Sequence, residues 1–210
     1  MESISAIHPV EEVESSYTEH DYFGLLSFPT LPIDNLHYTL LFDQLLKNIA
    51  WQQDSFTAFD RRFSIPRLQA WFADDGLRYR YADNLLTSQP WIDPLLQLRQ
   101  IIQNTTGHKF NSVLATRYRS GNDYVTWHSD DEKELGPNPV IASLSLGSAR
   151  YFEYRHKTQN TKGGLLLGQG DFLIMEPEFQ KHWEHQVPME PHVSGCRINL
   201  TFRYVEKSAR

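Results

Sequence analysis

Short runs of residues with an apolar period of two dominate the second half of this 210-residue chain. From Asn111 onward the runs are separated by Gly, Pro and Asn clusters; they are "SVLATRY", "DYVTWH", "VIASLSLG", "RYFEYRH", "GGLLLG", "DFLIMEP" and "CRINLTFRYV". Because side chains alternate between the two faces of a strand, each run predicts a strand with one face in a core. Seven or eight short strands predict a β-sandwich or a jelly-roll barrel.

Two segments before these runs follow the helical period instead. The first, "DNLHYTLLFDQLLKNIAW", has a cap candidate in Asp34 or Asn35, and its apolar stripe is Tyr38, Leu41, Phe42, Leu45 and Ile49. In the second, "DPLLQLRQIIQNTTG", Asp93 is placed to cap, Pro94 suits the first turn and Gly107 ends the helix. Its apolar stripe is Leu95, Leu98 and Ile102. The order of elements predicts an α+β fold, with a jelly-roll (double-stranded β-helix) core buttressed by N-terminal helices.

The charges limit the classes of protein to which the chain can belong. With 20 basic and 26 acidic residues the net charge is -6, which argues against a surface that binds nucleic acid all over but leaves room for a local basic patch. Residues 1–20 hold five glutamates and no Lys or Arg, so we expect an acidic, mobile arm there and a single domain over residues 21–210. No Rossmann or P-loop glycine pattern occurs.

The single cysteine and the N-terminal sequence predict the compartment. Cys196 has no partner for an intramolecular disulfide, and the first 20 residues lack the basic start and apolar run of a signal peptide. No apolar stretch approaches the roughly 20 residues of a membrane helix. We therefore expect a soluble intracellular protein, in cytoplasm or nucleus, without a membrane partner.

Candidate metal ligands lie at the end of one predicted strand and after another. In "VTWHSDDEKELG", His128 and Asp130 are two apart and share a strand face, and "KHWEHQVP" adds His182 and His185. Two histidines and one carboxylate on a β scaffold form the facial triad of non-haem Fe(II) oxygenases. A solvated acidic turn and a surface turn would explain the same residues without chemistry, and the spacing does not choose between His182 and His185.

The segment "RINLTFR" predicts a strand with one polar and one apolar face. The polar face consists of Arg197, Asn199, Thr201 and Arg203, and the apolar face of Ile198, Leu200 and Phe202. Two guanidinium groups in a row are costly to bury unless they meet an anion, and a dicarboxylate would satisfy both. A solvent-exposed polar face is the alternative.

Five segments in this order resemble the catalytic core of the AlkB family of Fe(II)- and 2-oxoglutarate-dependent dioxygenases, nearest its DNA-repair members: "WHSDDE", "IASLSLG", "FLIMEP", "HWEHQVP" and "RINLTFR". The resemblance covers roughly residues 60–205. It implies iron ligands at His128, Asp130 and His185, and O2 with 2-oxoglutarate as cosubstrates. The implied 2-oxoglutarate contacts are Tyr118, Arg197, Asn199, Thr201 and Arg203. Close relatives carry Asn where this chain has Thr116.

The resemblance also implies a nucleotide-recognition lid at about residues 55–90. Tyr79 and Tyr81 fall where relatives stack a base, and Glu132 falls where they contact its edge, although both tyrosines also fit half-buried strand positions. Arginines gather in the same stretch and are candidates for phosphate contacts; they are Arg61, Arg62, Arg67, Arg78 and Arg80.

The implied activity is oxidative demethylation of N-alkylated bases, of the 1-methyladenine or 3-methylcytosine type, in DNA or RNA. This direct reversal of damage releases formaldehyde and succinate, and we expect a monomer to perform it. Three alternatives are considered: a dioxygenase for another methylated target, such as protein or lipid, a catalytically silent nucleic-acid-binding module, and a cupin-like zinc or manganese enzyme on a related barrel. The polar face of "RINLTFR" does not predict the last of these. The sequence does not distinguish DNA from RNA, or single from double strands.

Overall fold

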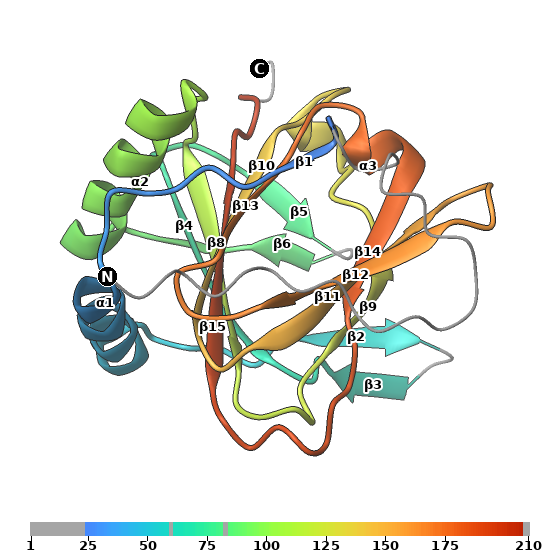
Figure 1. The fold of residues 1–210 in the computed structure, drawn as a ribbon, viewed down its shortest axis with the longest axis horizontal. Helices are drawn as coiled ribbons and strands as arrows, with labels where there is room; N and C mark the ends of the chain where they lie inside the picture. Colours follow the sequence, from blue (N-terminus) through green and yellow to red (C-terminus); the bar gives the residue numbers. More distant parts are fainter. Residues whose placement is uncertain (1–23, 59–60, 82–83, 208–210) are drawn as a thin grey trace.

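The computed structural model describes residues 24–58, 61–81 and 84–207 (Figure 1); within these, the side chains of residues 56–58, 62, 80–81 and 84–85 are not described. The predicted acidic arm at residues 1–20 lies outside the described residues. None of the helices in the described ranges combines the length and the apolar character needed to cross a membrane.

Two β-sheets form the body of the protein. The larger has the strand order β1-β13-β10-β15-β8-β4-β7; its bounds are Leu26–Ser27 (β1), Leu68–Ala73 (β4), Ser88–Gln89 (β7), Ser112–Tyr118 (β8), Ile141–Gly147 (β10), Phe172–Met175 (β13) and Arg197–Arg203 (β15). The smaller has the order β12-β11-β14-β9; its bounds are Val125–His128 (β9), Arg150–His156 (β11), Lys162–Leu167 (β12) and Trp183–Val187 (β14). Neighbouring strands are antiparallel except β4 and β7.

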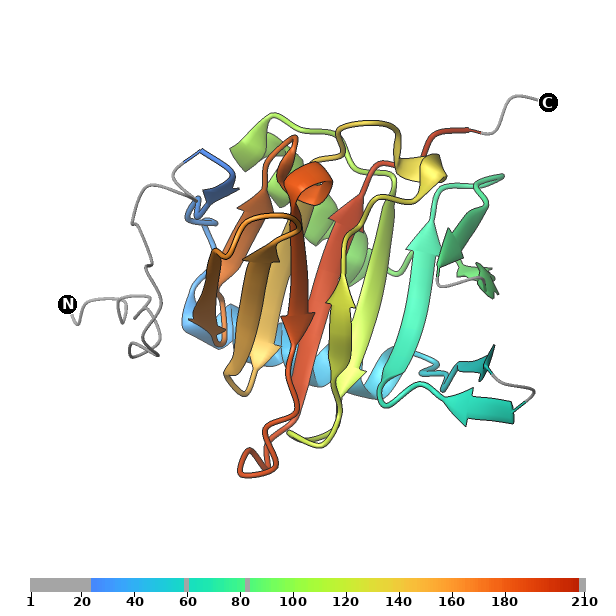
Figure 2. The same cartoon turned by 90° about the vertical axis from the view of Figure 1, so that its right-hand side faces the viewer.

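The sheets pack face to face, as the jelly-roll prediction requires (Figure 2). Apolar side chains from both sheets meet in one buried cluster, which includes Leu114 and Leu173 from the larger sheet and Phe152 and Trp183 from the smaller. The seven runs predicted after Asn111 all form strands. One further strand in this part of the chain, β14, was not among the predicted runs. The predicted fold class is confirmed.

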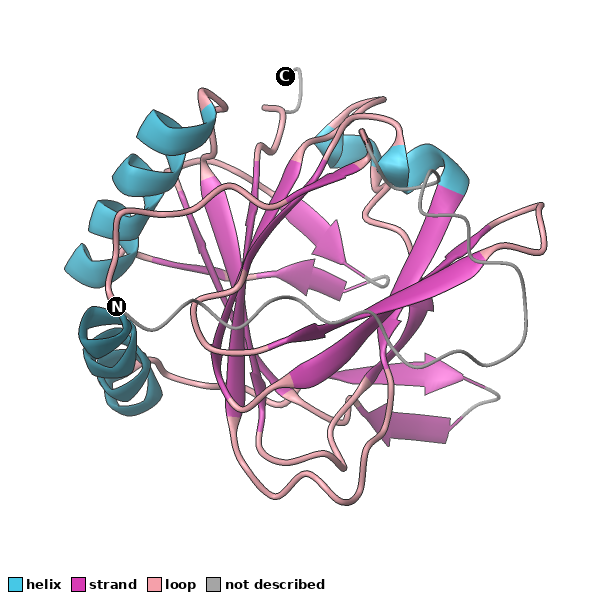
Figure 3. Cartoon of the chain, in the orientation of Figure 1, coloured by secondary structure: helices cyan, strands magenta, loops and turns pink. Residues whose placement is uncertain are grey.

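Two helices cover the outer face of the larger sheet (Figures 1 and 3). They are α1 (Asn35–Asn48) and α2 (Asp93–Thr106), and their buried residues Leu45 and Leu98 share a core cluster with Leu144 and Leu200 of the sheet. The helices therefore buttress one face of the larger sheet, as predicted. The opposite face of this sheet packs toward the smaller sheet.

The helix ends decide three predictions about capping. Asp34 caps α1, because its Oδ1 accepts a hydrogen bond of 2.8 Å from the backbone N–H of His37. The predicted cap at Asp93 is wrong: Asp93 is the first residue of α2, and the N-cap position is held by Ile92, without a side-chain cap. Gly107 ends α2 in the left-handed conformation, with φ of 74°, as predicted.

Two hairpins lie beside the β4 edge of the larger sheet (Figure 2). They are β2–β3 (Ser55–Ala58 and Arg61–Ser64) and β5–β6 (Tyr79–Tyr81 and Asn84–Leu86). The segment predicted as a lid, residues 55–90, thus comprises these hairpins together with β4 and β7, which belong to the sheet. A short helix α3 (Phe179–His182) and a 3₁₀ turn (Lys133–Leu135) complete the described elements.

Candidate active site

A polar pocket lies between the two sheets. The larger sheet contributes Gln69, Thr116, Ser143, Arg197, Asn199, Thr201 and Arg203; His128 and His185 come from the smaller sheet, and Arg67 and Asp130 from adjoining loops. These strand residues share one face because they alternate with the apolar residues that pack beneath the helices. Ile198, Leu200 and Phe202, for example, are fully buried in the helix-facing core.

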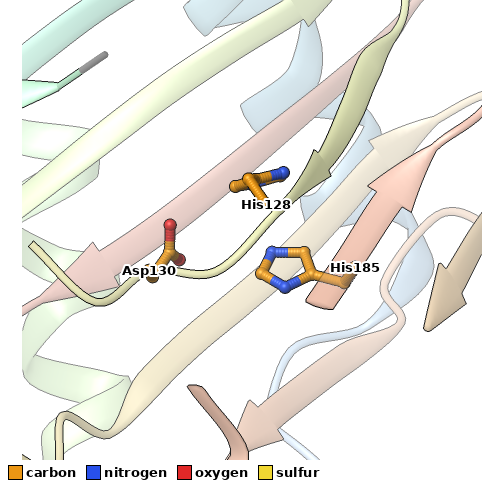
Figure 4. Close-up of side chains that lie close together, drawn as sticks. All are labelled: His128, Asp130 and His185. Carbon is orange, nitrogen blue, oxygen red and sulfur yellow. The ribbon is translucent and has the colours of Figure 1, made fainter. Parts of the chain in front are cut away.

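His128, Asp130 and His185 come together in this pocket (Figure 4). His128 ends β9 and stands opposite His185 of β14 in the register of the smaller sheet, and Asp130 follows in the loop. One ligand atom from each residue lies within 4.8 Å of the others, and this is the only such group in the described part of the chain. The structure thus brings together the three residues that the resemblance implied.

His182, the competing candidate, does not join this group. It is the last residue of α3, its side chain is 42% exposed, and its ring stacks on that of His156 at 6.0 Å. Geometry therefore separates two histidines that the spacing left equivalent.

Both pocket histidines are held in the neutral form, which is the form that binds metals. Burial lowers the pKa of His128, and burial together with the neighbouring His128 lowers the pKa of His185 to about 3. Nδ1 of His128 lies 2.8 Å from the carbonyl oxygen of Thr126. Since a carbonyl only accepts, Nδ1 of His128 carries the proton and Nε2 keeps its lone pair for a ligand.

Asp130 is held as a carboxylate. Burial raises its pKa, but the positive charge of Arg203 outweighs burial and holds the pKa below its usual value. Arg203 Nη2 donates to Oδ1 at 2.8 Å, and the backbone N–H of Asp130 donates to Gln180 Oε1 at 2.9 Å. The other oxygen, Oδ2, is buried without a hydrogen-bond partner in the described ranges. An ionised carboxylate with one open oxygen fits a cation.

Arg197 supplies the complementary feature, an unsatisfied buried cation. Its side chain is 1% exposed, and burial lowers its pKa. Nη2 donates to Ser145 Oγ at 2.9 Å, whereas Nε and Nη1 have no hydrogen-bond partner among the residues described. A buried guanidinium with two unused nitrogens fits a carboxylate ligand, which it can bind bidentately.

Asn199 and Thr201, between the two arginines, are already hydrogen-bonded within the protein. Asn199 Nδ2 donates to Ser143 Oγ at 2.8 Å and to the Leu144 carbonyl at 3.1 Å, and the Thr201 hydroxyl donates to Asn199 Oδ1 at 3.1 Å. Both side chains line the pocket, so they fix the shape of its floor.

Tyr118 stands at the Arg197 end, between two guanidinium groups. Its ring centroid lies 5.3 Å from Arg197 Cζ and 5.6 Å from Arg150 Cζ. Arg150 is fully buried and donates to Glu190 Oε2 at 2.8 Å and to the carbonyls of Ser120, Asp123 and Pro188. Arg150 therefore fixes the two loops behind the Arg197 end.

Three of the residues predicted to contact the substrate, Glu132, Tyr79 and Arg67, lie near the His-Asp-His cluster. Glu132 is half-buried, and burial together with the negative charge of Asp130 raises its pKa to about 7, while the positive charge of Arg203 acts in the opposite direction. Tyr79 has no exposed surface and its ring lies 5.8 Å from that of Trp71. Arg67 lines the pocket and donates to the Tyr124 carbonyl at 3.2 Å. The side chain of Tyr81 is outside the description.

Sequence reasoning missed three pocket residues or their supports: Gln69, Arg150 and Gln180. Gln69 and Arg150 lie in strands where a polar residue also fits an exposed position, so only pairing with distant segments reveals their burial. Gln180 lies in the short helix α3 before His185, with no local signal for its bond to Asp130.

Comparison with known proteins places the chain among oxygenases. The model of the 2OG-Fe(II) oxygenase superfamily matches residues 30–203. The Bos taurus protein "Alpha-ketoglutarate-dependent dioxygenase alkB homolog 3" is 41% identical over 180 residues, which are 81% of this chain and 62% of that protein. The Mus musculus protein "DNA oxidative demethylase ALKBH2" is 36% identical over 188 residues, which are 80% of this chain and 79% of that protein. The chain thus spans less than two thirds of the first relative.

Two solved structures share the fold at low sequence identity. The structure of OsALKBH1 has a TM-score of 0.59 at 15% identity and covers 86% of this chain and 96% of its own. An oxidoreductase of the 2OG-Fe(II) oxygenase family from Burkholderia pseudomallei also has a TM-score of 0.59, at 12% identity. The match covers 89% of this chain and 90% of that one.

Proposed function

This chain belongs to the AlkB branch of the 2OG-Fe(II) oxygenase superfamily, and we propose that it demethylates N-alkylated bases in DNA or RNA, releasing formaldehyde and succinate. One observation carries the proposal: a buried His-Asp-His cluster and the unpaired nitrogens of Arg197 line the same pocket. A metal and a carboxylate are the two ligands that this pair of features needs. That the enzyme acts as a monomer stays a prediction.

At the metal end, His128, Asp130 and His185 would hold Fe(II). The Thr126 carbonyl fixes the tautomer of His128, and Arg203 fixes the orientation of the Asp130 carboxylate. When bound, iron with 2-oxoglutarate and O2 supplies the oxidation that hydroxylates an N-methyl carbon, after which formaldehyde leaves. The protein orients the ligands and excludes water from the pocket.

At the other end, Arg197 would receive the distal carboxylate of 2-oxoglutarate on its two unpaired nitrogens. Tyr118 and Arg203 would complete the contacts, one beside Arg197 and one beside the metal, over the floor formed by Asn199 and Thr201. The pocket therefore has opposite charges at its two ends: the hydrogen-bond donors of Arg197 lie at one end, and the unpaired acceptor oxygen of Asp130 lies at the other.

For the substrate, we propose that a flipped base is stacked by Tyr79 and Tyr81 and contacted at its edge by Glu132, with Arg67 supporting it. The buried Tyr79 ring has to become accessible for stacking. The relatives support a nucleic-acid substrate, since the Mus musculus protein is named a DNA oxidative demethylase. The lesions proposed are of the 1-methyladenine and 3-methylcytosine type.

The test is a mass-spectrometric assay on matched single- and double-stranded DNA and RNA oligonucleotides carrying one 1-methyladenine or 3-methylcytosine. We expect the loss of one methyl group per succinate formed, dependent on Fe(II) and 2-oxoglutarate, with His185→Ala as the inactive control. Turnover of methylated protein or lipid alone would instead support the first alternative. Binding without succinate release on any substrate would support the silent module.

A further inference from the structure

Gln69 is a buried amide that the proposed roles leave unused. It lies in β4, opposite Thr116 of β8, and its side chain faces the pocket that holds the His-Asp-His cluster. Gln69 is 3% exposed, and its Oε1 has no hydrogen-bond partner within the described residues. A buried amide oxygen without a partner is unfavourable, so the position of Gln69 points to a ligand that donates to it.

A second cavity begins at the same residue. Its volume is about 240 Å³, and it shares Gln69 and Leu114 with the metal pocket. Its walls come from β4, from the segment before β2, and from the end of β6 with β7; among them are Gln53, Asp54, Trp71, Leu86, Thr87 and Gln89. A single water takes about 30 Å³ of liquid, so the cavity has room for a ligand larger than one water. Gln69 stands where the two cavities adjoin.

The cosubstrate cannot satisfy the Gln69 oxygen. At neutral pH 2-oxoglutarate carries only acceptors, so Oε1 would stay unpaired with 2-oxoglutarate bound. A base with an exocyclic amino group carries the missing donor. A glutamine amide pairs bidentately with adenine, accepting from N6 and donating to N7. Methylation at N1 leaves both atoms available, whereas 3-methylcytosine keeps only its amino group.

We propose that Gln69 is a substrate contact that pairs with N6 and N7 of 1-methyladenine and favours this base over 3-methylcytosine. The inference rests on the proposed demethylase function and assigns one determinant of its base preference. Glu132, on the loop after Asp130, would contact the other hydrogen of the same amino group.

The test compares kcat/KM on three single-stranded oligonucleotides, carrying 1-methyladenine, 7-deaza-1-methyladenine or 3-methylcytosine. In the wild type, removal of N7 should lower kcat/KM about 2- to 12-fold, the effect of one neutral hydrogen bond. Gln69→Leu should lower turnover of 1-methyladenine by roughly 5- to 150-fold, the range for a bidentate contact, and should abolish the effect of N7. Turnover of 3-methylcytosine should fall less.

Gln89→Leu is the matched control, because Gln89 lines the second cavity but donates to the Ala50 carbonyl. Gln89→Leu should leave the ratio of kcat/KM for 1-methyladenine to kcat/KM for 3-methylcytosine unchanged. The 7-deaza comparison in the wild type needs no variant, so the absence of an N7 effect there would refute the role of Gln69 even if Gln69→Leu does not fold.

Four results would overturn the inference. The first is an equal N7 effect in wild type and Gln69→Leu, and the second is an equal loss on all three bases together with a raised KM for 2-oxoglutarate, which would make Gln69 a cosubstrate contact. The third is a wild type that demethylates none of the oligonucleotides, in which case the proposed function itself fails. Demethylation with no N7 effect would remove the role of Gln69 alone.

Discussion

Replacing Arg197 by leucine isolates the anion-binding half of the site. The side chain is buried, two of its three guanidinium nitrogens have no partner in the described structure, and the third donates to Ser145. Leucine keeps much of the apolar volume of the arginine stem but has no donor. The change should therefore remove the contacts to the distal carboxylate of 2-oxoglutarate while leaving the metal ligands in place.

The size of the loss follows from those two nitrogens. A hydrogen bond to a charged group contributes about 1.5 to 3 kcal/mol, so two of them contribute roughly 3 to 6 kcal/mol to binding. The dissociation constant of 2-oxoglutarate should then rise roughly 10²- to 10⁴-fold. Thr116→Val is the comparison: Thr116 lines the same pocket, but a single neutral hydroxyl accounts for only about 0.5 to 1.5 kcal/mol.

Anaerobic titration calorimetry with Mn(II) in place of iron measures these constants directly. Thermal unfolding gives an independent measure, because 2-oxoglutarate at about 100 times its dissociation constant stabilises the wild type by about 2.7 kcal/mol. For a domain of this size that is a shift of roughly 5 to 11 °C. A variant that binds about 100-fold more weakly gains only about 0.4 kcal/mol. If Arg197→Leu binds within tenfold of wild type, or no worse than Thr116→Val, the assignment of the anion site is wrong.

Two further predictions concern the metal ligands and the support behind the pocket. His185→Ala should abolish turnover and Mn(II) binding, whereas the exposed His182→Ala should keep measurable activity; the reverse result would contradict the choice of His185. Arg150→Met should destabilise the protein by about 3 to 5 kcal/mol in urea unfolding, because it leaves Glu190 charged and buried. The matched surface change Arg155→Met should cost no more than about 1 kcal/mol, and equal effects would show that the buried pair has no special role.

Features that depend on local periodicity were predictable from the sequence. The alternation in "RINLTFR" separates a fully buried apolar face, with Ile198 and Leu200, from the polar face with Arg197 and Arg203. The structure matches because a strand with one face in a core must alternate, whatever its neighbours are. The start of α2 was less predictable: Asp93 fits the cap position by composition, yet the backbone turns helical at Asp93 itself.

Features that depend on distant pairing were not predictable in the same way. "HWEHQV" gave no strand signal, and β14 forms there because β9 and β11 supply hydrogen-bond partners on both sides. That pairing places His185 opposite His128, 57 residues earlier in the sequence. The resemblance to a family chose His185, but only the register explains why His182, at the end of α3, points elsewhere.

The atoms that the protein leaves unpaired describe its ligands better than the residue types do. Every polar group at the pocket could bind something, but most already bind each other: Asn199 and Thr201 are examples. The acceptor that stays open at Asp130 lies beside neutral histidines, and the donors that stay open at Arg197 lie at the other end. A cation and a carboxylate fit those two positions and cannot exchange them, because each would meet its own sign of charge. The open oxygen of Gln69 fits neither ligand, and that mismatch is the reason to look for its partner in the substrate.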